Sequence, residues 1–86
     1  MKIVRTDSFK KDYQQLPSHV QKIFENKLRI FIQNINHPSL RVKKMQGHEN
    51  RWEGSITMFY RFTFEMHEDH YLFRRIGPHD DVLRKP

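Results

Sequence analysis

An arginine between two aromatic residues, Tyr60-Arg61-Phe62, is the first feature of the sequence that could bind an anion. If Tyr60 and Phe62 point to one face of a strand, Arg61 points to the other, because successive side chains of a strand alternate. A planar, permanently charged guanidinium binds phosphate through paired hydrogen bonds. Arg61 is therefore a candidate phosphate ligand, although an ion pair with Glu53 or Glu65 would also account for it.

A histidine follows the glycine–proline turn in Ile76-Gly77-Pro78-His79, after the last apolar run of the chain. Imidazole gains and loses a proton near neutral pH, as a general acid or base must do. Asp80 or Asp81 could orient the ring. The alternative interpretation is a solvated histidine in a turn beside helix-capping aspartates. His79 is therefore a candidate functional residue only in combination with Arg61.

Further charged residues could hold or activate a nucleic acid. Lys43 and Lys44 face opposite ways if they lie on a strand, so at most one shares a face with Arg61. Lysines of this kind also protect the edge of a sheet from aggregation. Glu53, beside Trp52, could be a base or half of an ion pair. The full set of candidate RNA-binding residues is Lys43, Lys44, Arg51 and Arg84.

The sequence argues against a metal or a nucleotide cofactor. His67 and His70 flank acidic residues, but their spacing provides no third metal ligand. The glycines at 47, 54 and 77 form neither a phosphate loop nor a dinucleotide fingerprint. The absence of cysteine excludes disulfides and thiolate chemistry and favours a cytoplasmic protein. We expect no signal peptide and no membrane span.

Basic residues outnumber acidic ones, with sixteen Lys and Arg against ten Asp and Glu and a formal charge of +6. The first fifty residues hold ten of these bases but only four of the acids. A surplus of this sign is expected of a protein that binds nucleic acid. An acidic protein partner, or the solubility of a small domain, would also explain it.

The apolar pattern predicts one domain over residues 1–86, of class α+β with the order β-α-α-β-β-β(-β). A β-branched run over 2–6 predicts a strand, and Asp7 or Ser8 is expected to cap the next helix. Helical spacing continues to Leu16 and, after Pro17, to about Ile35. Alternation then predicts three or four antiparallel strands, with a turn at 67–70. We expect the helical pair to pack on one face of a small antiparallel sheet, leaving the other face open.

The order and spacing of these segments resemble one family of small proteins, although no single segment is specific. The segments are Phe9-Lys10-Lys11-Asp12-Tyr13 to Leu16, the long helix to Asn36-His37-Pro38-Ser39-Leu40, Lys43-Lys44 to Gly47, Trp52-Glu53, Tyr60-Arg61-Phe62 and Ile76-Gly77-Pro78-His79-Asp80. They look like the RelE/ParE superfamily of toxins from bacterial type II toxin–antitoxin modules, in which a helical pair packs on an antiparallel sheet. The resemblance covers nearly the whole chain.

RelE-like members of that superfamily cleave messenger RNA in the ribosomal A site without a metal ion. The resemblance therefore implies a cytoplasmic endoribonuclease that inhibits translation and is neutralised by an acidic antitoxin. It implies that Arg61 holds the scissile phosphate and that His79 acts as acid or base. Glu53 stands where RelE itself has a lysine, and it resembles the carboxylate base of other relatives only loosely.

ParE-like relatives share the fold but poison DNA gyrase, so a gyrase inhibitor or a catalytically silent binding relative is the alternative. The Arg61 and His79 pairing favours RNA, because the core of ParE-like relatives usually lacks it. Leu83 stands where many relatives have a tyrosine that stacks on a base or takes part in catalysis.

Overall fold

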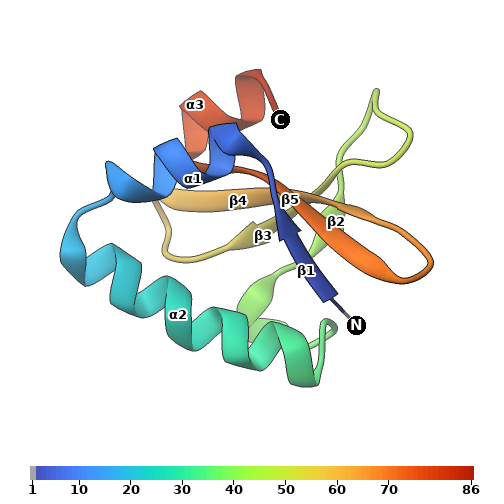
Figure 1. Cartoon of the computed structure of the whole chain (residues 1–86), viewed down its shortest axis with the longest axis horizontal. Helices are drawn as coiled ribbons and strands as arrows, with labels where there is room; N and C mark the ends of the chain where they lie inside the picture. The colour runs from blue at the N-terminus through green and yellow to red at the C-terminus, as the bar shows by residue number, and fades with distance from the viewer. Residues whose placement is uncertain (1) are drawn as a thin grey trace.

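A five-stranded sheet forms the middle of the molecule in the computed structural model, which describes residues 2–86 (Figure 1). The elements are β1 (Lys2–Arg5), α1 (Asp7–Gln14), α2 (Ser18–Gln33), the short 3-10 helix η1 (Pro38–Leu40), β2 (Lys43–Lys44), β3 (Trp52–Ser55), β4 (Tyr60–Met66), β5 (His70–Pro78) and α3 (His79–Arg84). The predicted α+β class and element order are confirmed. None of the helices within the described residues is both long and apolar enough to cross a membrane.

The strands lie in the order β1-β5-β4-β3-β2. The four strands from β2 to β5 pair with one another in antiparallel fashion, as predicted. The first strand instead lies parallel to β5, so the sheet is mixed at this edge. A parallel pair needs a long connection between its strands, and here the whole of the intervening chain provides it.

Two side chains, of Thr6 just before α1 and of Asp12 within it, form hydrogen bonds that join α1 (Asp7–Gln14) to β5. Thr6, rather than the expected Asp7 or Ser8, caps α1: its hydroxyl accepts from the backbone N–H of Phe9 at 3.0 Å and donates to the carbonyl of Arg74 at 2.8 Å. Asp12 accepts from the backbone N–H of Ile76 at 3.2 Å. Because β1 ends at Arg5, this carboxylate satisfies part of the edge of β5 that β1 does not reach.

The second helix ends at Gln33, two residues before the predicted end near Ile35. Asn34 is extended, and its side-chain oxygen accepts from the backbone N–H of Asn36 at 3.0 Å. Asparagine competes with the helix in this way by bonding nearby backbone groups. The helix buries Val20, Phe24 and Phe31 against the sheet.

Aromatic rings fill the core between the helices and the first face of the sheet. Phe62 and Phe64 point into it from β4, as the alternation predicted, and Phe73 joins them from β5. Gly54 lies opposite Phe62 in the neighbouring strand, and any side chain there would overlap the Phe62 ring. The buried phenylalanines are Phe9, Phe24, Phe31, Phe62, Phe64 and Phe73.

The second face of the sheet is not wholly open, contrary to our expectation. The last helix, α3, lies on it, on the opposite side of the sheet from α2 (Figure 1). Val82 of α3 is buried, and a Cβ on Gly77 would lie 3.5 Å from its side chain, in ordinary contact. A helix of six residues is too short for its periodicity to be recognised from the sequence.

Candidate functional site

Strand pairing brings the two main candidate residues together. Tyr60 pairs with Pro78 and Arg61 with Gly77, so Arg61 lies beside the turn that carries His79. The backbone N–H of His79 also donates to the carbonyl of Phe59 at 2.8 Å. The result is an open hollow of about 440 Å³, which we call the Arg61 hollow, lined by Met58, Phe59, Arg61, Pro78, His79, Asp80 and Asp81.

The guanidinium of Arg61 is held by backbone carbonyls of the preceding loop. Its Nη1 donates to the carbonyls of Thr57, Met58 and Tyr60, the last two at 3.0 and 3.1 Å. Within residues 2–86 it forms no ion pair, so the alternative of a pair with Glu53 or Glu65 is wrong. Its Nε and Nη2 make no hydrogen bond to the described residues, which leaves two adjacent donors for an anion.

His79 is the first residue of α3, and its ring is half-exposed. Nδ1 lies 3.1 Å from a carboxylate oxygen of Asp80, as one of the two predicted orienting interactions. This contact engages Nδ1 and leaves the other ring nitrogen, Nε2, available to a bound molecule. An imidazole with one nitrogen oriented and the other accessible can carry a proton to or from a bound molecule.

Glu53 is buried on the second face and lies outside the Arg61 hollow. Its carboxylate is 3.4 Å from the ammonium of Lys43, so the ion-pair alternative is present in the structure. In the register Ser55 pairs with Arg61, which places Glu53 diagonally from Arg61 across β3 and β4. Lys44 pairs with Trp52 and faces the opposite way from Lys43, as predicted.

A second open hollow, of about 450 Å³, lies at the other end of α3 and is strongly basic. Arg51 and Arg84, both predicted to bind RNA, come together in this basic hollow. Sequence reasoning missed Arg74, Arg75 and Lys85, although the double arginine was a visible signal. The lining residues are Thr6, Ser8, His48, Arg51, Arg74, Arg75, Arg84, Lys85 and Pro86.

A β-bulge explains why two consecutive arginines, Arg74 and Arg75, both line the basic hollow. Thr63 pairs with Arg75, whereas the next residue, Phe64, pairs with Phe73, so Arg74 has no partner of its own. Arg74 Nε donates to the carbonyl of Pro86 at 3.1 Å, and Arg75 Nη1 donates to that of Lys85 at 3.4 Å. Strict alternation would have sent one of these side chains to the core face.

Carboxylates balance only some of the cations of the basic hollow. Arg51 and Arg74 share one oxygen of Glu65, at 2.7 and 2.8 Å, and His67 contacts the other. Burial alone would raise the pKa of Glu65, but the hydrogen bond with His67 and the two guanidinium groups outweigh it and lower that pKa.

The other cations of the basic hollow differ in their partners. Asp12 pairs with Arg75 at 2.6 Å, and this hydrogen bond raises the pKa of Arg75. Arg84 and Lys85 form no ion pair with the residues that the structure describes. The basic hollow therefore keeps an excess of positive charge that could attract an anion.

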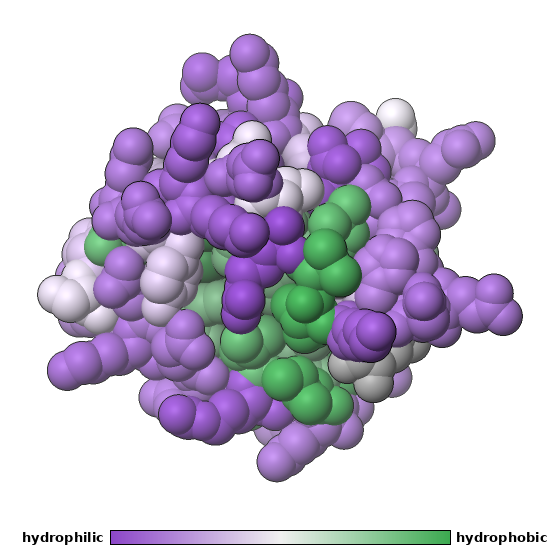
Figure 2. Space-filling view, in the orientation of Figure 1, coloured by the Kyte–Doolittle hydropathy of each residue, from purple (hydrophilic) through white to green (hydrophobic). Residues whose placement is uncertain are grey.

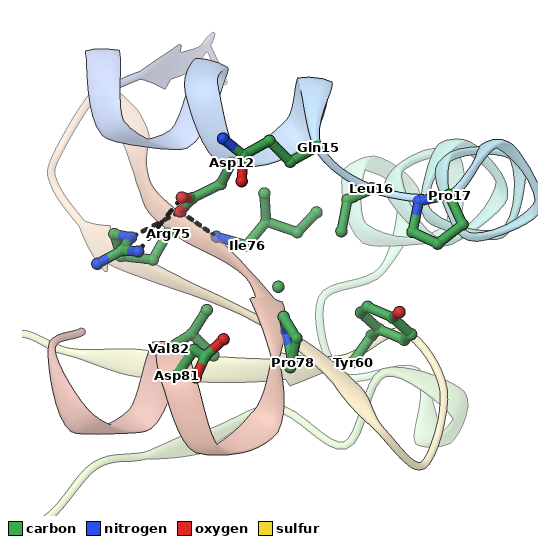
Figure 3. Close-up of a pocket in the computed structure, with 11 residues that line it drawn as sticks. Asp12, Gln15, Leu16, Pro17, Tyr60, Arg75, Ile76, Pro78, Asp81 and Val82 are labelled. Carbon is green, nitrogen blue, oxygen red and sulfur yellow. Dashed lines mark hydrogen bonds and ion pairs between the residues drawn. The ribbon is translucent and has the colours of Figure 1, made fainter.

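Two other hollows are less suited to an anion. One, of about 300 Å³, lies between α1 and α3, where Asp12 bonds both Arg75 and the backbone of Ile76 (Figure 3). The charge of its one arginine is thus already balanced. The other lies between β1 and α2, where Figure 2 shows apolar side chains gathered on the surface, and it has no charged lining. Ile3, Ile32 and Tyr71 contribute to it.

Comparison with known proteins identifies the fold. No protein-family model matches the chain. No curated protein matches its sequence. Among solved structures, a YoeB/ParE toxin from Agrobacterium tumefaciens matches with a TM-score of 0.78 and 19% identity, over 92% of this chain and 99% of that one.

Two further solved structures give the same result. The RelB–RelE antitoxin–toxin complex of Methanococcus jannaschii matches with a TM-score of 0.72 and 24% identity, over 96% and 99% of the two chains. YafQ from E. coli matches with a TM-score of 0.79 and 12% identity, over 94% and 96%. The predicted resemblance to RelE/ParE toxins is confirmed in the fold.

Proposed function

We propose that this chain, which has the fold of the YoeB, RelE and YafQ toxins, is the toxin of a type II toxin–antitoxin module and cleaves messenger RNA. The observation that carries the proposal is the Arg61 hollow, where a guanidinium without a carboxylate partner lies beside an accessible imidazole. Such a pair suits a reaction at a phosphate group. The reaction proposed needs no metal ion.

The reaction is an in-line attack of a ribose 2′-OH on the adjacent phosphate. A bond forms between the 2′ oxygen and phosphorus, and the bond to the 5′ oxygen of the next nucleotide breaks. The products are a 2′,3′-cyclic phosphate and a free 5′-OH. This step needs a base for the 2′ proton, an acid for the leaving oxygen, and stabilisation of the charge that builds on the phosphate.

Arg61 is assigned the charge stabilisation, because its Nε and Nη2 can donate together to two phosphate oxygens. His79 is assigned a proton transfer through Nε2, as acid toward the leaving 5′ oxygen or as base toward the 2′-OH. Glu53, diagonal to Arg61 on the same face, is the candidate for the remaining proton transfer. Its role requires that the nearby Lys43 leave one carboxylate oxygen accessible.

The basic hollow is assigned the RNA backbone on one side of the cut. It lies at the C-terminal end of α3, and the Arg61 hollow lies at the N-terminal end, so one strand of RNA passing α3 could reach both. Arg51 and Arg84 would contact phosphates there together with Lys85. Lys43 and Lys44, on the edge strand β2, are proposed to contact RNA farther away.

The proposed substrate is mRNA in the ribosomal A site, and the proposed partner is an acidic antitoxin. The positive net charge supports both. Three of the matching structures are complexes with antitoxins, RelB in two and DinJ in the third. The apolar surface between β1 and α2 supports a protein partner, because phosphate contacts would not use it. A protein with this proposed substrate would act in the cytoplasm.

A gyrase inhibitor is the second candidate, since one matching structure carries the name YoeB/ParE. Induction would then cause a DNA-damage response without RNA cleavage. A catalytically silent binding relative would cause neither.

The test is induction in a bacterial host, with growth measured and cleavage sites mapped by primer extension. We expect Arg61→Ala to lower cleavage about 100- to 1,000-fold, as the loss of a charge-stabilising donor does. His79→Ala should lower it about 100- to 10,000-fold. Exposed residues of α2 provide matched controls, Lys22→Ala and His19→Ala, which should cleave like the parent protein.

Circular dichroism would establish that all four variants are folded. If the folded Arg61→Ala and His79→Ala proteins stay as toxic as the parent, the site is assigned wrongly. Cleavage of purified mRNA with and without ribosomes decides whether the ribosome is required.

A further inference from the structure

The loop between β3 and β4 carries two large apolar side chains that protrude into solvent. Met58 is 79% exposed and Phe59 is 72% exposed, the two highest values among the large apolar residues of the described chain. Both line the Arg61 hollow. Small proteins seldom expose neighbouring large apolar side chains without a binding role.

The side chain of Phe59 is not needed to hold this loop in place. The backbone N–H of Phe59 donates to the hydroxyl of Thr57 at 3.2 Å, and its carbonyl accepts from His79 at 2.8 Å. Arg61 holds the neighbouring carbonyls of Thr57 and Met58. The ring is therefore presented by a loop that backbone and arginine contacts fix, and substitution of the ring should leave the loop intact.

We propose that Phe59 is a stacking platform for a nucleobase of the bound RNA, next to the phosphate that Arg61 holds. This rests on the proposed function and names how the same site recognises its substrate. Aromatic side chains beside a cationic groove bind single-stranded RNA in this way, because every base offers a flat face. A nucleotide joins phosphate and base, and the Arg61 hollow offers a partner for each.

An apolar or acidic side chain of a protein partner fits the Arg61 hollow less well. An apolar group over the hollow would remove water from the guanidinium without replacing its hydrogen bonds. An acidic side chain could bind Arg61, but it offers no hydrogen-bond donor to Asp80 and Asp81, which also line the hollow. These carboxylates can instead accept hydrogen bonds from the amino groups of a base.

The test measures binding of a short RNA that carries a 2′-deoxy residue at the attacked position and so cannot be cleaved. We expect Phe59→Ala and Phe59→Leu to bind about tenfold or more weakly than the parent, and Phe59→Trp to keep full affinity. Ile32→Ala is the matched control, because Ile32 is also exposed, at 62%, but lies on α2. It should bind like the parent.

The stacked base is located with RNAs that lack one base, on either side of the blocked phosphate. At one of these positions the abasic RNA should weaken binding to the parent but cause no further loss with Phe59→Ala. Such non-additivity identifies a direct contact. The fluorescence of Phe59→Trp should also be quenched by RNA, while that of Ile32→Trp should not, with Trp52 as a common background.

The outcomes separate this inference from the function on which it rests. If the parent binds the RNA and Phe59→Ala binds equally well, or if the two losses simply add, the platform is refuted while the nuclease proposal stands. If the parent neither binds nor cleaves RNA, the proposed function is refuted and the platform with it.

Discussion

At the scale of the residue, Arg61 differs from Arg51, which precedes β3, and from the two arginines of β5. Arg51, Arg74 and Arg75 each contact a carboxylate, of Glu65 or Asp12. Among the described residues, the Arg61 side chain forms hydrogen bonds only with carbonyls, and these carry no full charge. Its guanidinium thus retains its net positive charge in an open hollow, which is the condition for binding a phosphate rather than stabilising the fold.

Phe59 provides an exposed aromatic ring, which Leu83 cannot provide. Leu83 is half-buried on α3 and offers no ring where the resemblance to RelE-like toxins led us to expect a tyrosine. An exposed ring that lines the Arg61 hollow comes instead from Phe59, in the loop before β4. In our proposal Phe59 therefore makes the contact with a base.

Glu65 gives the first stability prediction, because its carboxylate joins three basic groups while it is only 14% exposed. Its pKa is lowered from 4.5, so its charged form is favoured in the folded protein. A group with a lowered pKa stabilises the fold above its unfolded pKa, and this contribution is lost as the pH falls through the folded pKa. We expect Glu65→Gln to cost about 1–3 kcal/mol in the free energy of unfolding at pH 7.

The difference between Glu65→Gln and the parent should shrink as the pH falls below 4.5, since the parent then loses the same charge. Urea unfolding between pH 7 and pH 3 would measure it. Glu68→Gln is the control, because Glu68 is exposed in the turn before β5. A constant difference across this pH range would contradict the assignment.

At the scale of the element, Gly54 and Gly77 lie on opposite faces of the sheet and differ in the space that a side chain would have there. Gly54 of β3 lies under the buried ring of Phe62 on the core face, where nothing can move aside easily. Gly77 of β5 lies beside Val82 of α3, with room for a methyl group at 3.5 Å. The packing of the aromatic core thus requires a glycine at position 54. The contact between β5 and α3 would accommodate a small side chain at position 77.

We expect Gly54→Ala to destabilise the protein by about 1–3 kcal/mol or more, as overpacking of a core does. Gly77→Ala is the matched control, the same substitution in the neighbouring part of the sheet, and should cost less than about 1 kcal/mol. Thermal and urea unfolding would compare the two. Equal losses would mean that the Phe62 ring can move away from β3.

At the scale of the whole molecule, the two hollows where RNA is proposed to bind lie apart from the apolar surface. The Arg61 hollow and the basic hollow lie at opposite ends of α3, on the side of the sheet away from α2. The apolar surface between β1 and α2 is separate from both. In our proposal, a nucleic acid and a protein partner therefore use distinct surfaces.

This separation predicts how RNA binding responds to salt. The logarithm of the binding constant should fall linearly with the logarithm of the salt concentration, with a slope of about −0.7 for each phosphate contact to a single strand. Arg84→Ala and Lys85→Ala should each make the slope less steep by roughly that amount. Lys22→Ala, which removes the same charge from α2, should weaken binding little and leave the slope unchanged. Equal effects of all three would indicate binding through net charge alone.

The local patterns of the chain were enough to predict most of its architecture. Helical spacing identified α2, and alternation placed Phe62 and Phe64 on the opposite face from Arg61. The position of His79 beside Arg61 was expected only from the resemblance to RelE-like toxins, because the register of β4 and β5 there depends on the bulge at Arg74, which local patterns do not reveal. Which of these residues acts on a substrate stays a prediction.

The tertiary structure alone decided the contacts between distant segments. The parallel pairing of β1 with β5, the bond from Asp12 to the edge of β5, and the seat of α3 each join residues far apart in the chain. The basic hollow depends on all of these and on the bulge at Arg74, which overrides the alternation of a regular strand. Periodicity specifies which face a side chain takes within its own element, but it carries no information on which elements meet.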